Sequence, residues 1–328
     1  NRSRNTHLEI ADQMINEGTL DLIMGAGHPF YDNNGVLRAT PNHDDWMSEA
    51  DWDALNGPDA PMTLIDTKAE FEALADGTLH VDDRLFGLAP VANTLQYSRS
   101  YLGDDPSVAS GWAKIETVPS LETMTIGALN QLGKDEDGMF LMVEGGAVDW
   151  AAHGNWTEWV IEEQVDFNLS IDAAVDWVEA NSSWDETLMI VMTDHGNGMV
   201  MGPNSDTIPY EPIPNMGAGV VPDVLWHSGS HTTENTLLWA HGAGSEKLLE
   251  QVVGIDPWLA MIMDAAEGEF AGLGFNDGRY IDITGVNPAI RAAAGLVDTP
   301  APIPLPAAGW MLIAGVGALA AAKRKRAA

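Results

Sequence analysis

The chain has no cysteine among its 328 residues. Disulfides, zinc–thiolate sites and cysteine nucleophiles are therefore excluded together, although this absence does not fix the cellular compartment. A phosphate-binding loop of the form Gly-x4-Gly-Lys-Ser/Thr is also absent. The sequence therefore offers no motif evidence for a nucleoside triphosphate site.

Basic residues are scarce. Lysine and arginine together number 15, against 49 aspartate and glutamate residues, which gives a formal net charge of −34. Such a surface repels nucleic acid, so we expect no nucleic-acid partner. An anionic substrate would need local positive charge, and bound metal is the main source that this composition leaves. The acidity is typical of adaptation to salty water, with bulk calcium binding as the alternative.

The length and the apolar fraction of 45% suit one large α/β domain or two smaller ones. Apolar periodicity predicts helices near residues 8–15, 121–132 and 158–180, and strands over residues 20–24, 85–88, 139–143 and 187–192. This alternation predicts a doubly wound, mostly parallel sheet with helices on both faces. The acidic, Trp-rich segment 38–62 suggests a surface insertion, and the Pro/Gly-rich segment 202–223 a long loop.

Metal-ligating side chains follow the apolar runs. The run 139–143 stops at Glu144, and Asp149 and His153 come soon after it. Asp149 and His153 are four residues apart, so on a helix they would share a face. Because sites in open α/β sheets lie beyond the carboxyl ends of the strands, this position favours a functional site.

Two further clusters repeat the pattern. The run 188–192 stops at Thr193-Asp194-His195, and Ser228-Gly-Ser-His231 precedes the apolar run 236–240. Taken singly, each aspartate reads as a helix cap or turn former and each histidine as structural. Jointly they predict a metal site, since mixed Asp/His ligation favours zinc and a carboxylate-only position favours magnesium. His227, four residues before His231, is a further ligand or, on the simpler interpretation, a loop residue.

These segments resemble a known family. Val143-Glu-Gly-Gly-Ala-Val-Asp-Trp-Ala-Ala-His153, Thr193-Asp-His195 and Ser230-His-Thr232 are similar, in order and spacing, to the metal-binding segments of alkaline phosphatases. Residues 5–27 and Asp277–Asp282 resemble other parts of that family. The resemblance covers roughly residues 1–295, and we expect a partial catalytic domain over residues 1–298.

The resemblance implies specific roles. Two zinc ions and one magnesium ion are expected, with small phosphate esters as substrates and a phosphoserine intermediate. A homodimer is compatible with it. The implied ligands are Asp149, His153 and His231 for the first zinc, Asp194 and His195 for the second, and Glu144 for magnesium.

The chain also departs from the family pattern. It contains no Asp-Ser pair, so no catalytic residue is assigned within it and the nucleophilic serine is expected upstream of residue 1. We therefore expect a chain that lacks its N-terminal part and is inactive alone. Trp150 stands where some members have lysine or histidine, which leaves its role open.

The C-terminal segment 299–328 differs in kind. An uncharged apolar run, 307–322, follows a Pro-rich stretch and precedes the basic tail 323–326. Its sixteen residues are slightly short for a spanning helix, but flanking Trp and basic residues can offset a small mismatch. We therefore expect a C-terminal transmembrane helix.

The order of motif, apolar run and basic end in this tail resembles a PEP-CTERM-type sorting signal in its Pro-Leu-Pro-Ala variant. That resemblance implies export in a Gram-negative bacterium to the periplasm or cell surface. It also implies a membrane anchor that is at least transient, and processing by an exosortase-type enzyme.

The sequence thus predicts an exported, metal-dependent alkaline phosphatase. A phosphodiesterase or sulfatase of the same superfamily shares the metal ligands, but the spacing from Glu144 to His153 favours the phosphatase. A non-catalytic calcium-binding surface protein fits the charge and the anchor. Nothing in that last role requires Asp/His pairs at strand ends, and a count of bound zinc separates the two classes.

Overall fold

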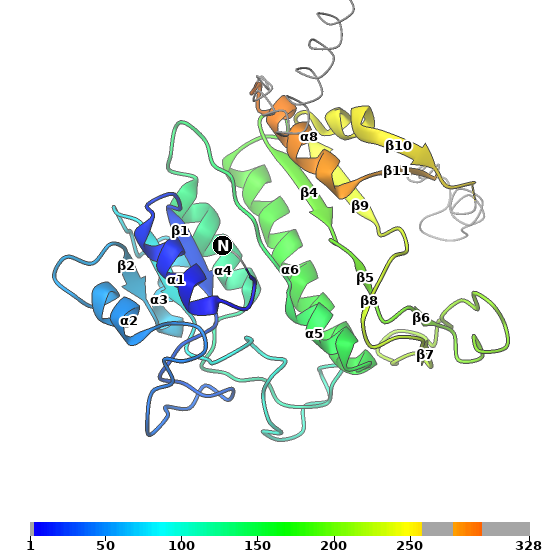
Figure 1. The fold of residues 1–328 in the computed structure, drawn as a ribbon, viewed down its shortest axis with the longest axis horizontal. Coiled ribbons are helices and arrows are strands. Elements are labelled where there is room, and N and C mark those ends of the chain that lie inside the picture. Colours follow the sequence, from blue (N-terminus) through cyan, green and yellow to red (C-terminus); the bar gives the residue numbers. More distant parts are fainter. Residues whose placement is uncertain (1–2, 258–277, 297–328) are drawn as a thin grey trace, which may run out of the picture. The chain divides into compact units, whose positions relative to one another are not determined.

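The computed structural model describes residues 3–257 and 278–296 (Figure 1). It divides into two compact units, Asn1–Trp239 and Ala240–Ala328, which are described separately below. The apolar run and basic tail predicted to anchor the chain lie outside the described residues. Within the described part, no helix has the length and apolar character needed to cross a membrane.

A parallel sheet forms the centre of the first unit. Its strands are β1 (Leu22–Gly25), β3 (Leu85–Leu88) and β2 (Thr63–Ile65), in the order β1-β3-β2. Leu22 and Thr63 both pair with Leu85, and both pairings are parallel. All four residues of β3 are buried, as expected for the central strand. The predicted strands 20–24 and 85–88 are confirmed, whereas β2 was not predicted.

Helices contribute to the apolar clusters on both faces of this sheet. They are α1 (His7–Asn16), α2 (Glu49–Leu55), α3 (Lys68–Ala75) and α4 (Leu121–Leu132). Phe86 and Leu88 pack in one cluster with Ile15 of α1. Leu85 packs in another cluster with Phe71 of α3. Because successive side chains of a strand alternate between faces, these two clusters lie on opposite faces of the sheet. The α/β class and the helices predicted over 8–15 and 121–132 are confirmed.

The segment predicted as a surface insertion takes part in the core. It contains α2, which begins after Ser48, whose hydroxyl accepts a hydrogen bond from Asp51 N–H. Met47, Leu55 and Met62 are buried in the same cluster as Phe86. Although the segment is rich in Asp and Trp, some of its apolar side chains therefore pack in the core beside the sheet.

Two arginines connect distant parts of the first unit. The Arg84 guanidinium donates to the carbonyls of Met14, Ile15 and Leu20, and so holds the end of α1 against the sheet. Arg99 pairs with Glu162 at 2.8 Å, and both side chains are almost fully buried. Glu162 belongs to α6 (Thr157–Asn181), the helix predicted over residues 158–180.

The predicted strand over residues 139–143 is wrong: the structure has no strand there. Phe140 is 72% exposed and Met142 is 77% exposed. A strand exists only where a neighbouring backbone pairs with it, and the described residues offer this segment no partner. The apolar spacing that predicts the helix over residues 158–180 does not mark a fully buried face, because Val165 and Leu169 are exposed.

The rest of the first unit carries further strands. The predicted strand over 187–192 is confirmed as β4 (Leu188–Met192). Two antiparallel pairs follow, β5 (Gly196–Asn197) with β8 (His231–Thr232), and β6 (Val200–Met201) with β7 (Leu225–Trp226). Together they make a two-stranded ribbon, and the segment 202–223 between β6 and β7 is a loop, as predicted.

The second unit begins within β9 (Leu238–Gly242). A 3₁₀ helix, η1 (Ser245–Gln251), leads into β10 (Val252–Ile255), which pairs antiparallel with β11 (Arg279–Ile281). A second 3₁₀ turn, η2 (Ile283–Gly285), precedes α8 (Val286–Ala293). The strand β11 lies within the segment Asp277–Asp282 that resembles the family, although Asp277 itself is outside the described residues.

Candidate metal centre

The first two predicted ligands stand on one short helix, α5 (Ala147–His153). Asp149 and His153 are one turn apart, and His153 Nε2 lies 3.4 Å from Asp149 Oδ2. The helix ends at Gly154, and Asn155 then adopts a left-handed backbone with φ 57°. The sequence prediction that these two side chains share a face of a short helix is confirmed.

The third ligand comes from the ribbon. In the β5–β8 pair, Asn197 is opposite His231. This pairing brings His231 Nε2 to 3.2 Å from His153 Nε2 and 3.3 Å from Asp149 Oδ1. Three side chains from two distant segments thus converge on one point.

The separations between these atoms fit a metal ion. Two ligand atoms bound tetrahedrally to one zinc at about 2.0–2.1 Å lie about 3.3 Å from each other. His153 Nε2 and His231 Nε2 lie 3.2 Å apart, and each lies 3.3–3.4 Å from one oxygen of the Asp149 carboxylate, Oδ2 for His153 and Oδ1 for His231. Each of these side chains is 35–40% exposed, so an ion can reach them from solvent. One carboxylate with two imidazoles is also a donor set that zinc accepts.

Hydrogen bonds from neighbouring residues fix the orientation of two of the predicted ligands, His153 and Asp149. His153 Nδ1 lies 2.9 Å from the carbonyl of Gly229, which favours the tautomer whose Nε2 lone pair faces His231 and Asp149. Asn197 Nδ2 donates to Asp149 Oδ1 at 2.6 Å and to the Asp149 carbonyl at 3.2 Å. Neither partner was predicted from the sequence. Asn197 stands two residues after His195, a spacing that places side chains on one side of an extended chain, and that signal would have found it.

The second predicted zinc pair lies beside the first set. Asp194 Oδ2 is 3.3 Å from His195 Nε2, so this pair also has the separation of two ligands on one ion. The His195 ring stacks on the His231 ring with centroids 3.5 Å apart. Ligand atoms of Asp149, His195 and His231 all lie within 4.8 Å of one another. Ions in two-metal sites are about 3.5–4 Å apart, so adjacent ligands of this kind are expected there.

Glu144 stands apart from this cluster. It is exposed, and its carboxylate lies over the backbone of Gly146. The set of ligand atoms that lie within 4.8 Å of one another does not include it. Its assignment to magnesium stays a prediction.

The two residues whose roles were open also have clear positions. His227 Nε2 lies 2.8 Å from Ser205 Oγ, which ties the loop 202–223 to the ribbon and agrees with the loop interpretation. Trp150 follows Asp149 directly and is 40% exposed. Its role stays open.

Comparison with known proteins decides the family. The family model described as alkaline phosphatase matches residues 1–218. The chain belongs to the alkaline phosphatase family. Alkaline phosphatase 3 of Bacillus subtilis (strain 168) is 39% identical over 85 residues, which are 26% of this chain and 18% of that protein. The human tissue-nonspecific alkaline phosphatase isozyme is 33% identical over 86 residues, 26% of this chain and 16% of that protein.

One solved structure supports the fold. The crystal structure of Thermus thermophilus alkaline phosphatase aligns with 91% of this chain and 67% of its own, with a TM-score of 0.54 and 18% identity. At this identity the likeness shows the alkaline-phosphatase-like α/β fold alone. The segments aligned with the two curated relatives above span less than a fifth of the length of those proteins.

Proposed function

We propose that this protein is a metal-dependent phosphate monoester hydrolase. The observation that carries the proposal is the convergence of Asp149, His153 and His231 at ligand-to-ligand distances of 3.2–3.4 Å. Family membership supports the reaction class, and the donor set supports zinc. In this proposal a second zinc is held by Asp194 and His195, and magnesium by Glu144.

The residues of the chain perform distinct tasks in this proposal. The Gly229 carbonyl and the Asn197 amide fix His153 and Asp149 before any ion arrives, which lowers the cost of organising the site. Bound zinc supplies positive charge for the phosphoryl and leaving-group oxygens. This charge matters here because a net charge of −34 otherwise repels a phosphate dianion.

The nucleophile is proposed to come from a serine outside these 328 residues. The family forms a phosphoserine, yet the chain contains no Asp-Ser pair. The 328-residue chain loaded with zinc and magnesium is therefore expected to leave p-nitrophenyl phosphate unhydrolysed. Turnover at a rate typical of an efficient enzyme, about 10 s⁻¹, would contradict this part of the proposal.

Zinc stoichiometry tests the metal centre without needing activity. After dialysis against zinc and then against buffer, elemental analysis is expected to find one tightly held zinc ion per chain, because the first site has three protein ligands and the second has two. His231→Ala and His153→Ala each leave the first site with two ligands and should lower the zinc content well below one per chain. His227→Ala is the matched control, because His227 contacts Ser205 and should leave the count at one.

Two results would contradict the assignment. If His231→Ala and His153→Ala both retain the wild-type zinc content, the ligands have been misassigned. If calcium at millimolar concentration displaces all the zinc, the site prefers oxygen-only ligation, and the calcium-binding surface protein becomes the better interpretation.

A further inference from the structure

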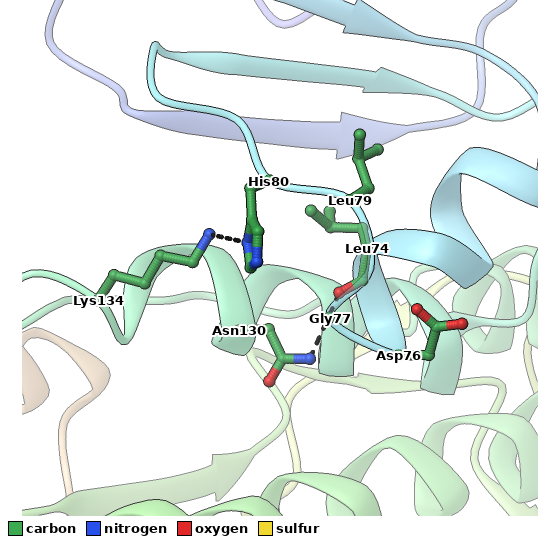
Figure 2. A pocket seen from close by; sticks show the side chains of 7 residues that line it. All are labelled: Leu74, Asp76, Gly77, Leu79, His80, Asn130 and Lys134. Carbon is green, nitrogen blue, oxygen red and sulfur yellow. Dashed lines mark hydrogen bonds between the residues drawn. The ribbon is translucent and has the colours of Figure 1, made fainter.

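A hollow of about 300 Å³ lies between the end of α3 and α4, in a part of the first unit that the metal centre does not use. Figure 2 shows the side chains that line it, with Lys134 and His80 on one side and Asp76 on the other. Its volume is at the lower end of the range found for small-molecule sites. Its lining gives it a definite chemical character.

One end of the hollow carries an uncompensated positive charge. Lys134 Nζ lies 3.1 Å from His80 Nδ1 and donates to Gln131 Oε1 at 3.3 Å. A lysine ammonium has three N–H donors and no acceptor, so His80 Nδ1 accepts and carries no proton. Among the described residues, Lys134 forms no ion pair, although the chain has 49 acidic residues. The third N–H of Lys134 remains available to a ligand.

The other end carries a fixed negative charge. Asp76 Oδ1 accepts from the Thr78 hydroxyl at 2.6 Å and from the Thr78 N–H at 2.9 Å. These hydrogen bonds from Thr78 hold the pKa of Asp76 below its ordinary value, so the carboxylate stays ionised. Asp76 caps the C-terminus of α3, whose dipole also favours a cation. The described ion pairs do not include Asp76.

The wall between the two charges is held in place and is only partly apolar. Leu79 and Asn130 line it, Leu74 lies beneath it in the core, and Gly77, with φ +76°, adds no side chain. A Cβ at Gly77 would meet no atom within 4 Å, so this part of the hollow is open. Asn130 donates to the Ala75 carbonyl at 2.7 Å and to the Leu74 carbonyl at 3.4 Å, and so joins α3 to α4. Figure 2 shows the hydrogen bond to Leu74.

We propose that this hollow binds a small zwitterion, an amino acid whose ammonium group meets Asp76 and whose carboxylate meets Lys134. A simple anion would face Asp76 and the negative charge of the whole chain, and a simple cation would face Lys134. Only a ligand with both charges pairs each end, and a short methylene spacer suits Leu79 and the open backbone at Gly77 between them. This proposal does not depend on the metal centre or on the phosphatase reaction.

A series of amino acids of increasing length tests the proposal on the full 328-residue chain. Glycine, β-alanine, 4-aminobutyrate and 6-aminohexanoate are titrated calorimetrically, with butylamine and butyrate as singly charged controls. An amino acid of one length is expected to bind best, with a Kd on the order of 1 mM. Its affinity should fall as salt is added, because salt screens the two charge pairs. Butylamine and butyrate should bind at least about tenfold more weakly.

Variants locate the site. Asp76→Asn removes the negative charge and keeps the acceptor for Thr78. Lys134→Met removes the positive charge and keeps the length of the side chain. Each variant should lower the affinity for the best ligand about three- to tenfold. Asp137→Asn, an exposed acidic residue just after α4, is the matched control and should bind as wild type does.

Circular dichroism checks that each variant is folded. The proposal is overturned if no member of the series binds at 10 mM, if butylamine binds as well as the amino acids, or if both charge variants bind like wild type.

Discussion

Glu163 of α6 makes the stability of the chain depend on pH in an unusual direction. Its pKa is raised from 4.5 to about 7, first by burial and then by the negative charges of Asp166 and Glu162. One of its carboxylate oxygens, Oε1, is buried without a hydrogen-bond partner among the described residues. At a pH between 4.5 and about 7, Glu163 therefore carries a proton in the folded protein and has lost it in the unfolded chain.

The magnitude follows from linkage. Between pH 4.5 and pH 7 the folded state binds more protons at this site than the unfolded state, so stability falls as pH rises through this window. A pKa raised from 4.5 to about 7 corresponds to roughly 3 kcal/mol in total. Between pH 5 and pH 8 the loss is about 2.5 kcal/mol. Burial also raises the pKa of Asp166, which acts in the same direction.

Glu163→Gln isolates this contribution, because glutamine is neutral at every pH. The variant should be about 2–3 kcal/mol more stable than wild type at pH 8 and differ by less than about 1 kcal/mol at pH 5. Urea unfolding at both pH values measures this difference. Glu158→Gln, at an exposed position on the same helix, controls for the substitution itself. A stability difference between Glu163→Gln and wild type that does not change with pH would refute the reasoning.

Three further outcomes are expected. Arg99→Met leaves Glu162 buried without its ion-pair partner and should cost about 3–5 kcal/mol in urea unfolding, with much of the loss recovered in the double variant with Glu162→Leu. Asn197→Ala removes the amide that holds Asp149 and should weaken zinc affinity about 10–100-fold, as measured by competition with a chelator. A chain ending at Asp298 should stay soluble, whereas the full chain should sediment with membranes in a host without the processing enzyme. Equal solubility of these last two would contradict the anchor.

Local pattern was enough to predict several elements. The helix at 121–132 has an N-cap serine, apolar residues at helical spacing and a glycine at its end, and the structure shows the same bounds. The four-residue spacing of Asp149 and His153 was likewise a local signal. These predictions succeeded because each depends on interactions within a few residues of the chain.

Features that depend on distant pairing were harder to predict. The apolar run 139–143 is typical of a buried strand, but an apolar pattern does not supply the second backbone that a strand needs. The approach of His231 to His153 depends on the ribbon register, which pairs Asn197 with His231 and has no local signature. The acidic segment 38–62 hid Met47 and Leu55 from a composition argument, because only a few of its side chains face the sheet.

The proposed ligands of the first zinc lie on both sides of the loop 202–223, so a bound ion would restrict the chain between them. A zinc ion bound to both His153 and His231 would cross-link these two positions and close the chain between them into a loop. Cross-linking a loop of this length restricts the unfolded chain by about 4–5 kcal/mol if it acts as a disulfide does. Zinc would thereby do in this cysteine-free chain what a disulfide does elsewhere. After a protease cut within the loop, a bound zinc ion would still join the two pieces, in addition to the pairing of β5 with β8 and of β6 with β7.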